Sequence, residues 1–322
     1  MNTNFNKMMF FYTMMMGTLM SMSANNWLMI WIGMEISTTA IMPLIPNKNF
    51  LSSESTVKYF IIQSISSSMM MLGVLLLLIN SKIEYQMILT SSMMMKMGVA
   101  PFHNWILEMT EGLELMTMFL ILTFMKMAPL NMISYLTFKN NLFIILSLIM
   151  GSLFGLNQTS MRKMMCYSSI FNMGFIISSI QINSIWWTYL ILYSMMLAMI
   201  LYLMKKMKIY YINQMTLNEN KMSLKMNIWL AMMAMGGMPP MIGFMLKLMV
   251  IQLMLINKEY LISTLMIMTS MLVMFYYLRM SFISIMFSSL MMKWSMWNTE
   301  KSSTWIIMFN LIAMPYIVML KT

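Results

Sequence analysis

Long apolar segments, separated only by short clusters of Asn, Ser, Lys and Glu, make up nearly the whole chain. A helix of about 20 apolar residues crosses the hydrocarbon core of a bilayer, where only helices or closed barrels satisfy the backbone polar groups. Eleven such segments follow one another: 5–23, 26–45, 55–80, 84–107, 113–135, 141–157, 161–181, 184–204, 226–255, 260–286 and 303–320. The pattern predicts an all-α polytopic membrane protein with eleven transmembrane helices.

The composition excludes a water-soluble protein. Of the 322 residues, 60% are hydrophobic and only 9% are charged, whereas soluble domains carry about 25% charged residues. Disorder is excluded by the same values. The net charge of +11 does not indicate nucleic-acid binding, because the basic residues are scattered among the connectors instead of being gathered on one wet face.

The chain has few residues that could hold a metal or a redox group. Cys166 is its one cysteine, His103 its one histidine, and all nine acidic residues are glutamates. Intrachain disulfides, Cys-ligated iron–sulfur clusters and Cys-based zinc sites are therefore excluded. We expect no cofactor and no metal site in this chain.

Methionine occupies places where Ile or Leu is usual. There are 58 methionines, and runs such as Met93–Met95 fill the interiors of predicted spans, so methionine serves as a general apolar residue. A genetic code that reads an isoleucine-like codon as Met, as in animal mitochondria, explains this composition. No cleavable signal precedes the first span, so we expect synthesis inside the compartment where the protein works.

The basic residues predict an orientation. Twelve lie at the N-terminus or after even-numbered spans, four lie in the opposite connectors, and four lie within spans. The first group is Lys7, Lys48, Lys58, Arg162, Lys163, Lys205, Lys206, Lys208, Lys221, Lys225, Lys293 and Lys301, and the second is Lys82, Lys139, Lys258 and Lys321. The positive-inside rule then places the N-terminus inside and the C-terminus outside.

Four charged residues fall at membrane depth. Glu35 is in the middle of the second span, Lys96 and Lys126 lie deep in the fourth and fifth, and Lys247 lies in the ninth. A charge at the centre of a span costs about 2.5–3.5 kcal/mol on insertion scales, so such residues mark functional sites by default. One alternative is that Glu35 pairs with one lysine only to hold helices together. The other is a set of proton-accepting lysines, since a lysine changes protonation readily when its partner moves.

Helix breakers stand beside two of these lysines. The segment Lys96–His103 contains Gly98 and Pro101, and the segment 236–244 contains Gly237 and Pro240; proline interrupts a helix. Broken helices in the fourth and ninth spans, five spans apart, are typical of inverted repeats. We therefore expect a first five-helix repeat at 1–135, broken at about 84–107, and a second at 141–286, broken at about 226–255. One extra C-terminal helix would follow at 303–322.

His103 follows Lys96 by seven residues, or two helical turns, which predicts a similar face of the helix. Two interpretations of this single histidine remain open. It is either a satisfied core residue or a neutral relay between lysines.

Several motifs together resemble a known family. These are Trp31–Ile36, Ser53–Phe60, Lys96–Trp105, Lys126–Pro129 and Gly237–Phe244. In this order the sequence is similar to the antiporter-like membrane subunits of respiratory complex I, and within them to the chain 2 family of mitochondrial NADH:ubiquinone oxidoreductase, invertebrate type. The likeness covers essentially the whole chain.

The resemblance implies proton translocation that is driven by electron transfer in other subunits. Glu35 would be the carboxylate paired with Lys96, Lys126 the middle relay, Lys247 the terminal lysine, and His103 a point on the axis between them. Flavin and iron–sulfur clusters would belong to partner subunits. The implied location is the mitochondrial inner membrane with the N-terminus on the matrix side and the C-terminus on the intermembrane-space side. The implied partners are the other membrane-arm subunits and membrane lipids.

Two further functions stay open at this point. The same motifs occur in self-standing cation/proton antiporters, which would exchange ions without any partner. A purely structural membrane scaffold would need none of the buried lysines for transport.

Overall fold

A computed structural model describes residues 5–46, 50–79, 83–136, 140–180, 185–217 and 222–286. The chain divides into two compact units, Met1–Ser147 and Leu148–Thr322. This division falls within α8 (Asn141–Leu156), the first helix of the second predicted repeat. The predicted last helix at 303–320 lies outside the described residues. So do seven of the lysines that predict the orientation: Lys48, Lys82, Lys139, Lys221, Lys293, Lys301 and Lys321.

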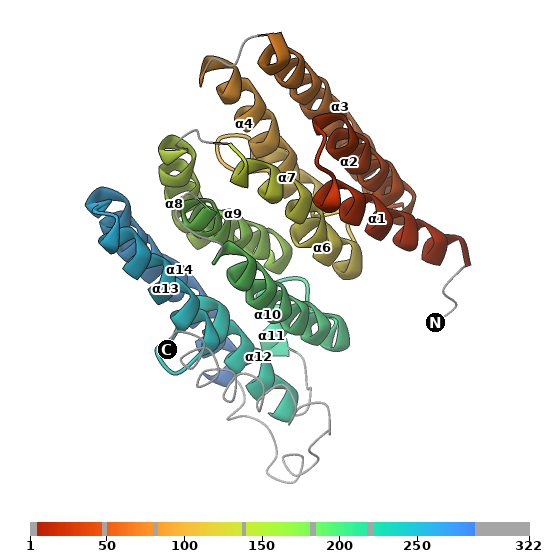
Figure 1. The fold of residues 1–322 in the computed structure, drawn as a ribbon. Helices are drawn as coiled ribbons and strands as arrows, with labels where there is room; N and C mark the ends of the chain where they lie inside the picture. The colour runs from red at the N-terminus through yellow and green to blue at the C-terminus, as the bar shows by residue number, and fades with distance from the viewer. Residues whose placement is uncertain are drawn as a thin grey trace. The chain divides into compact units, whose positions relative to one another are not determined.

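Helices form almost all of the described structure (Figure 1). The first unit contains α1 (Phe5–Ser23), α2 (Trp27–Ile41), the short 3₁₀ helix η1 (Met42–Leu44), α3 (Phe50–Ile79), α4 (Ile83–Met97), α5 (Asn104–Met109), α6 (Leu115–Leu122) and α7 (Phe124–Ser134). The second contains α9 (Met161–Ile180), α10 (Trp186–Met207), α11 (Gln214–Leu217), α12 (Met222–Gly236), α13 (Ile242–Ile256) and α14 (Tyr260–Met286).

The all-helical prediction is confirmed for the described residues, although α3 begins at Phe50, five residues before the predicted segment 55–80. Five described helical stretches are long and apolar enough to cross a membrane: Trp27–Leu44, Phe50–Ile79, Leu115–Ser134, Trp186–Met207 and Tyr260–Ile283. Two shorter apolar helices are Asn141–Leu156 and Ile242–Ile256. The chain is therefore a polytopic membrane protein by length and composition of its helices, while the number of eleven spans and the inverted repeat stay predictions.

Three predicted spans are interrupted within the described structure. The fourth is divided between α4 and α5, and the ninth between α12 and α13. The third interruption, at Thr123 between α6 and α7, has no helix breaker in the sequence: Thr123 has φ −120° and ψ −73°, which are not helical angles. Each of these interruptions lies within a few residues of a buried lysine.

Small residues allow α1 and α2 to pack closely in the first unit. A Cβ atom added to Gly17 would lie 2.8 Å from the carbonyl oxygen of Gly33, so the two backbones meet directly. Close contact between small residues is a usual way for membrane helices to associate. Gly33 lies two residues before Glu35, so this contact fixes the part of α2 that holds the carboxylate.

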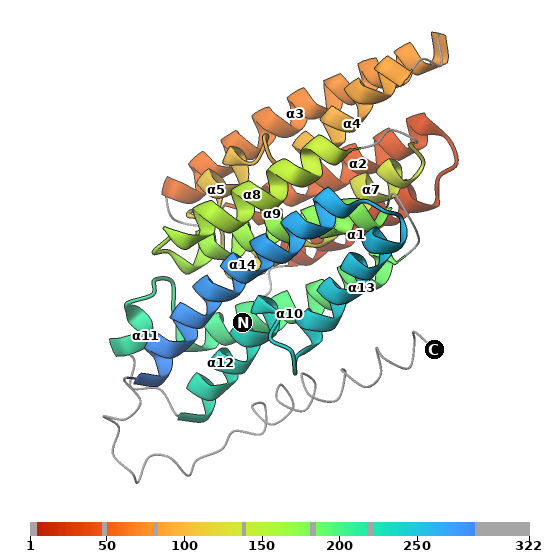
Figure 2. The same cartoon turned by 90° about the vertical axis from the view of Figure 1, so that its left-hand side faces the viewer.

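The second unit is arranged around α9, of whose 20 residues 17 are buried. Helix α9 contacts α10 and α13, and α14 packs against α12 and α13 (Figure 2). A helix that is buried on all sides belongs to the interior of its unit. Its central residue Phe171 is therefore well placed to contact the lysine described below.

Candidate functional site

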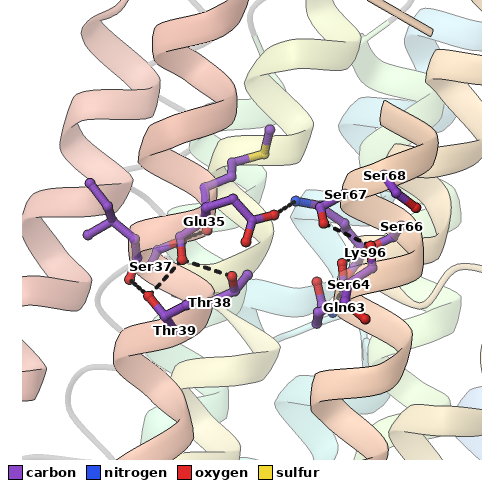
Figure 3. A network of polar contacts seen from close by, with 12 residues as sticks. Glu35, Ser37, Thr38, Thr39, Gln63, Ser64, Ser66, Ser67, Ser68 and Lys96 are labelled. Atoms are coloured by element: carbon purple, nitrogen blue, oxygen red, sulfur yellow. Dashed lines mark hydrogen bonds and ion pairs between the residues drawn. The ribbon is translucent and has the colours of Figure 1, made fainter. Parts of the chain in front are cut away.

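Glu35 and Lys96 form a buried ion pair in the first unit. The distance between Glu35 Oε1 and Lys96 Nζ is 3.8 Å, and the exposed fractions of their side chains are 31% and 3%. Figure 3 shows the two side chains pointing toward each other from α2 and α4. Within the described residues neither Glu35 Oε1 nor Lys96 Nζ has a hydrogen-bond partner. The pair is thus close enough for electrostatic attraction but too far apart for a direct hydrogen bond.

The hydroxyl groups around Glu35 do not replace this missing bond. Thr38 and Thr39 donate to the backbone carbonyl oxygen of Glu35 at 3.0 and 2.9 Å, and Ser37 donates to the carbonyl of Met34 at 2.8 Å (Figure 3). Such bonds to the preceding helical turn satisfy the hydroxyl donors locally. These hydroxyl bonds therefore leave Glu35 Oε1 with Lys96 as its charged neighbour at 3.8 Å.

Lys96 lies in the last turn of α4, which ends in a glycine-terminated cap. Gly98 has φ +64°, its N–H donates to Met95 O at 3.1 Å, and the N–H of Val99 donates to Met94 O at 3.0 Å. This bond pattern is the Schellman motif, which satisfies carbonyls at a helix end and favours glycine. The partial negative charge of a helix C-terminus also favours a cation in that turn.

The segment after the cap folds back onto α4 and α3. The indole N–H of Trp105 in α5 donates to Met95 O at 3.2 Å, which adds a second donor to that carbonyl. The amide of Gln63 in α3 donates to Lys96 O at 3.3 Å. Both bonds fix the backbone beside Lys96.

His103 lies in the turn that leads into α5, and it is buried with an exposed fraction of 5%. Its ring Nδ1 is 3.1 Å from Pro101 O. The expectation that His103 and Lys96 share one helix face is wrong, because α4 ends at Met97 and the seven-residue spacing is no longer helical.

A small cavity lies beside Lys96 in the first unit. Its lining includes Lys96, Tyr59 and Gln63 together with Met125 and Pro129 of α7. Its volume of about 10 Å³ is close to that of one water-sized sphere. The cavity therefore adjoins both Lys96 and the helix that holds the next predicted lysine.

Lys126 is buried in α7, with an exposed fraction of 3%. Its backbone N–H donates to the carbonyl oxygen of Thr123 at 3.1 Å, where the helix restarts after the interruption. Helix α7 packs against α1, α2 and α4. The structure thus brings the segment containing Lys126 to the helices that provide Glu35 and Lys96.

Lys247 is the predicted site lysine of the second unit, and it is buried. Its ammonium donates a hydrogen bond of 2.7 Å to Gly236 O and lies 5.4 Å from the centre of the Phe171 ring. The residue has an exposed fraction of 6%. The acceptor is the terminal carbonyl of α12, at the same helix break that the Gly-Pro segment predicts.

The two helix breaks have the same local geometry. Gly237 has φ +84°, its N–H donates to Ala234 O at 3.2 Å, and Met238 N–H donates to Met233 O at 3.2 Å. In the first unit the lysine belongs to the helix that ends, whereas in the second the lysine reaches back from the following helix. In the second unit the ammonium group is hydrogen-bonded to the C-terminal end of a helix closed by glycine, and in the first unit the lysine residue lies in the last turn of such a helix.

Sequence reasoning did not identify two groups of this site. Tyr59 has a buried hydroxyl beside the cavity, and its only sequence signal was its position in the Ser53–Phe60 motif. The acceptor of Lys247, a main-chain carbonyl, has no sequence signal at all. Buried amines with polar partners, next to a space for water, can hold a proton and pass it on.

Comparison with known proteins shows the family of the chain. The model of the family "NADH:quinone oxidoreductase/Mrp antiporter, TM" matches residues 24–89 and 79–273. NADH-ubiquinone oxidoreductase chain 2 of Locusta migratoria is 35% identical, with 100% of this chain and 96% of the relative covered. The protein of the same name from Anopheles gambiae is 34% identical, with 97% and 96% covered.

Solved structures share the fold. A chain of respiratory complex I from Thermus thermophilus has a TM-score of 0.77 at 18% identity, with 88% of this chain and 71% of that chain covered. A chain of the Mrp complex from Dietzia sp. has a TM-score of 0.72 at 12% identity, with 84% and 59% covered.

Proposed function

Because the chain belongs to the NADH-ubiquinone oxidoreductase chain 2 family, we propose that it carries protons through Glu35, Lys96, Lys126, His103 and Lys247. It is a core membrane subunit of the proton-pumping NADH:ubiquinone oxidoreductase, respiratory complex I. Relatives with nearly complete coverage are named as subunits of that enzyme. The chain does no redox chemistry itself in this proposal, and flavin and iron–sulfur clusters are assigned to partner subunits.

The observation that supports the proton role is that Glu35 and Lys96 form an ion pair without a direct hydrogen bond. Two unit charges 4 Å apart attract each other by about 4 kcal/mol at an effective dielectric constant of 20, and the observed distance is 3.8 Å. This attraction favours the protonated form of Lys96. A movement that separates the pair would remove it.

The proposed mechanism is a gated lysine relay. While Glu35 is close, Lys96 keeps its proton; when the carboxylate moves away, Lys96 passes the proton toward Lys126 in the first unit. Lys247 is the corresponding lysine of the second unit and the last of the series. His103, buried beside the break, is the proposed neutral relay on this axis.

The same proposal includes the location. The protein would lie in the mitochondrial inner membrane among the other membrane-arm subunits and lipids, with the N-terminus on the matrix side and the C-terminus in the intermembrane space. Eleven spans, ten of them in two inverted five-helix repeats and one in a final helix, fit this orientation. Protease protection of tags at both termini in intact inner-membrane vesicles would test it.

The function is tested by NADH-driven proton pumping in the assembled complex. We expect Lys96→Met or Glu35→Gln to lower pumping strongly, while Lys205→Met, at an exposed lysine in the last turn of α10, leaves it unchanged. Equal amounts of assembled complex must be compared. Normal pumping in either buried-site variant would contradict the relay and favour a structural scaffold.

The self-standing antiporter is a separate possibility that experiment can distinguish. The purified chain in liposomes should exchange neither Na⁺ nor K⁺ for protons if it works only as a subunit. Likeness to the Mrp structure at 12% identity concerns the fold alone, whereas the relatives of similar length are named as chain 2 of the respiratory enzyme.

A further inference from the structure

We propose that Tyr59 is a positioning residue for the proton relay: its hydroxyl holds a water molecule in the cavity beside Lys96, and this water connects Lys96 to the α7 segment that contains Lys126. The inference rests on the proposed proton function and adds to it a residue and a water site.

The ring of Tyr59 is packed against Trp105, but its hydroxyl group is buried without a hydrogen bond in the described structure. It has an exposed fraction of 1%, and its hydroxyl has no hydrogen-bond partner among the described residues. Its ring lies 6.1 Å from the Trp105 ring, centre to centre, with the planes tilted by 52°. Buried polar groups in proteins are nearly always hydrogen-bonded, so a polar partner is expected at this place.

A water molecule in the cavity would be that partner. Tyr59 and Lys96 both line it, and both the tyrosine hydroxyl and the lysine ammonium are buried groups without a hydrogen bond in the described structure. An ammonium only donates, whereas water and a tyrosine hydroxyl each donate and accept. A single water in the cavity can therefore accept from Lys96 and bond to Tyr59.

Helix α7 supplies a third group. Met125 and Pro129 of α7 line the same cavity, and proline has no N–H to give to the carbonyl four residues before it. The Met125 carbonyl consequently lacks its usual helical donor. A water bonded to Lys96, Tyr59 and Met125 O would have three partners, which is the usual number for a buried water.

This arrangement defines the role of the hydroxyl in the relay. One proton leaves Lys96 Nζ for the water oxygen while another leaves the water toward the α7 segment that contains Lys126, and the neutral amine of Lys126 is the proposed final acceptor. The water ends unchanged, and one proton has moved from one amine to the other. Tyr59 neither gains nor loses a proton over the whole step, because it only orients the water.

The test is Tyr59→Phe in the assembled complex, which keeps the ring and its contact with Trp105. We expect NADH-driven pumping to fall about two- to tenfold, the factor that one ordinary hydrogen bond is worth. The solvent deuterium isotope effect on pumping should rise, because proton transfer becomes slower. The control is Tyr189→Phe, which removes another buried hydroxyl, bonded to Asn172 at 2.9 Å in the second unit.

The outcomes separate this inference from the proposed function. Normal pumping in Tyr59→Phe, an unchanged isotope effect, or an equal loss in Tyr189→Phe would overturn the role of Tyr59. If Lys96→Met also pumped normally, the proposed function itself would fail. Direct support would be an ordered water within hydrogen-bond distance of Lys96 Nζ and Tyr59 Oη in an experimental map of the complex that resolves waters elsewhere. An empty cavity in such a map would overturn the water site.

Discussion

Lys247 donates a 2.7 Å hydrogen bond to the carbonyl oxygen of Gly236, so the buried ammonium is bound to the end of a helix. The neighbouring Gly237 closes that helix with φ +84°. A Cβ atom added to Gly237 would lie 2.9 Å from Lys247 Nζ. The cap and the lysine therefore depend on the same glycine.

We expect Gly237→Ala to destabilise the complex and to displace Lys247. The left-handed backbone costs a residue with a side chain about 1–2 kcal/mol, and the added methyl group meets the ammonium. Heat inactivation of NADH-driven pumping should begin at a lower temperature. Gly236→Ala is the matched control, since its Cβ atom would lie 3.4 Å from Tyr277 Cβ, an ordinary contact. Equal heat resistance of the Gly237→Ala and unsubstituted complexes would contradict this account.

Trp105→Phe tests how the helix break is held. The substitution keeps an aromatic ring but removes the N–H that bonds to Met95 O at 3.2 Å. Gly98 N–H still donates to that carbonyl, so we expect a loss of about 1 kcal/mol in stability, the net worth of one hydrogen bond. Hydrogen exchange of the α5 amides should become faster. Unchanged exchange would show that the indole bond does not stabilise the turn.

Lys58 makes two ion pairs that should matter little. Its ammonium lies 2.9 Å from Glu54 Oε1 and 2.9 Å from Glu108 Oε2, with side chains 36%, 46% and 58% exposed. Exposed ion pairs are weak because water and salt screen them. We expect Lys58→Met to leave both pumping and the inactivation temperature unchanged. A loss of pumping as large as that of Lys96→Met would place Lys58 on the proton path.

The sequence predicts the helices well because polar clusters and Gly-Pro segments mark where apolar segments end. The helix caps at Gly98 and Gly237 form because glycine readily adopts a positive φ. Both glycines can be recognised in the sequence motifs. The interruption at Thr123 was missed, since threonine is neither a strong helix breaker nor a usual signal for one.

The charged residues of the site could be predicted from the sequence, but the groups that they contact could not. Glu35 and Lys96 stand out because charges are rare in this chain, and the structure brings them within 3.8 Å. The bond from Lys247 to Gly236 O and the cavity beside Tyr59 depend on main-chain atoms and free volume, which residue types do not encode. His103 illustrates the same limit, because its spacing from Lys96 lost its helical meaning once α4 ended at Met97.

The most direct test of the central claim is the number of protons pumped per NADH oxidised in a Lys96→Arg complex. Arginine keeps the positive charge opposite Glu35 but does not release its proton in proteins. Assembly is checked by the amount of intact complex that contains this membrane subunit. If Lys96 carries protons, the number per NADH falls in Lys96→Arg although the charge pair is kept; an unchanged number would show that Lys96 serves only as a fixed charge.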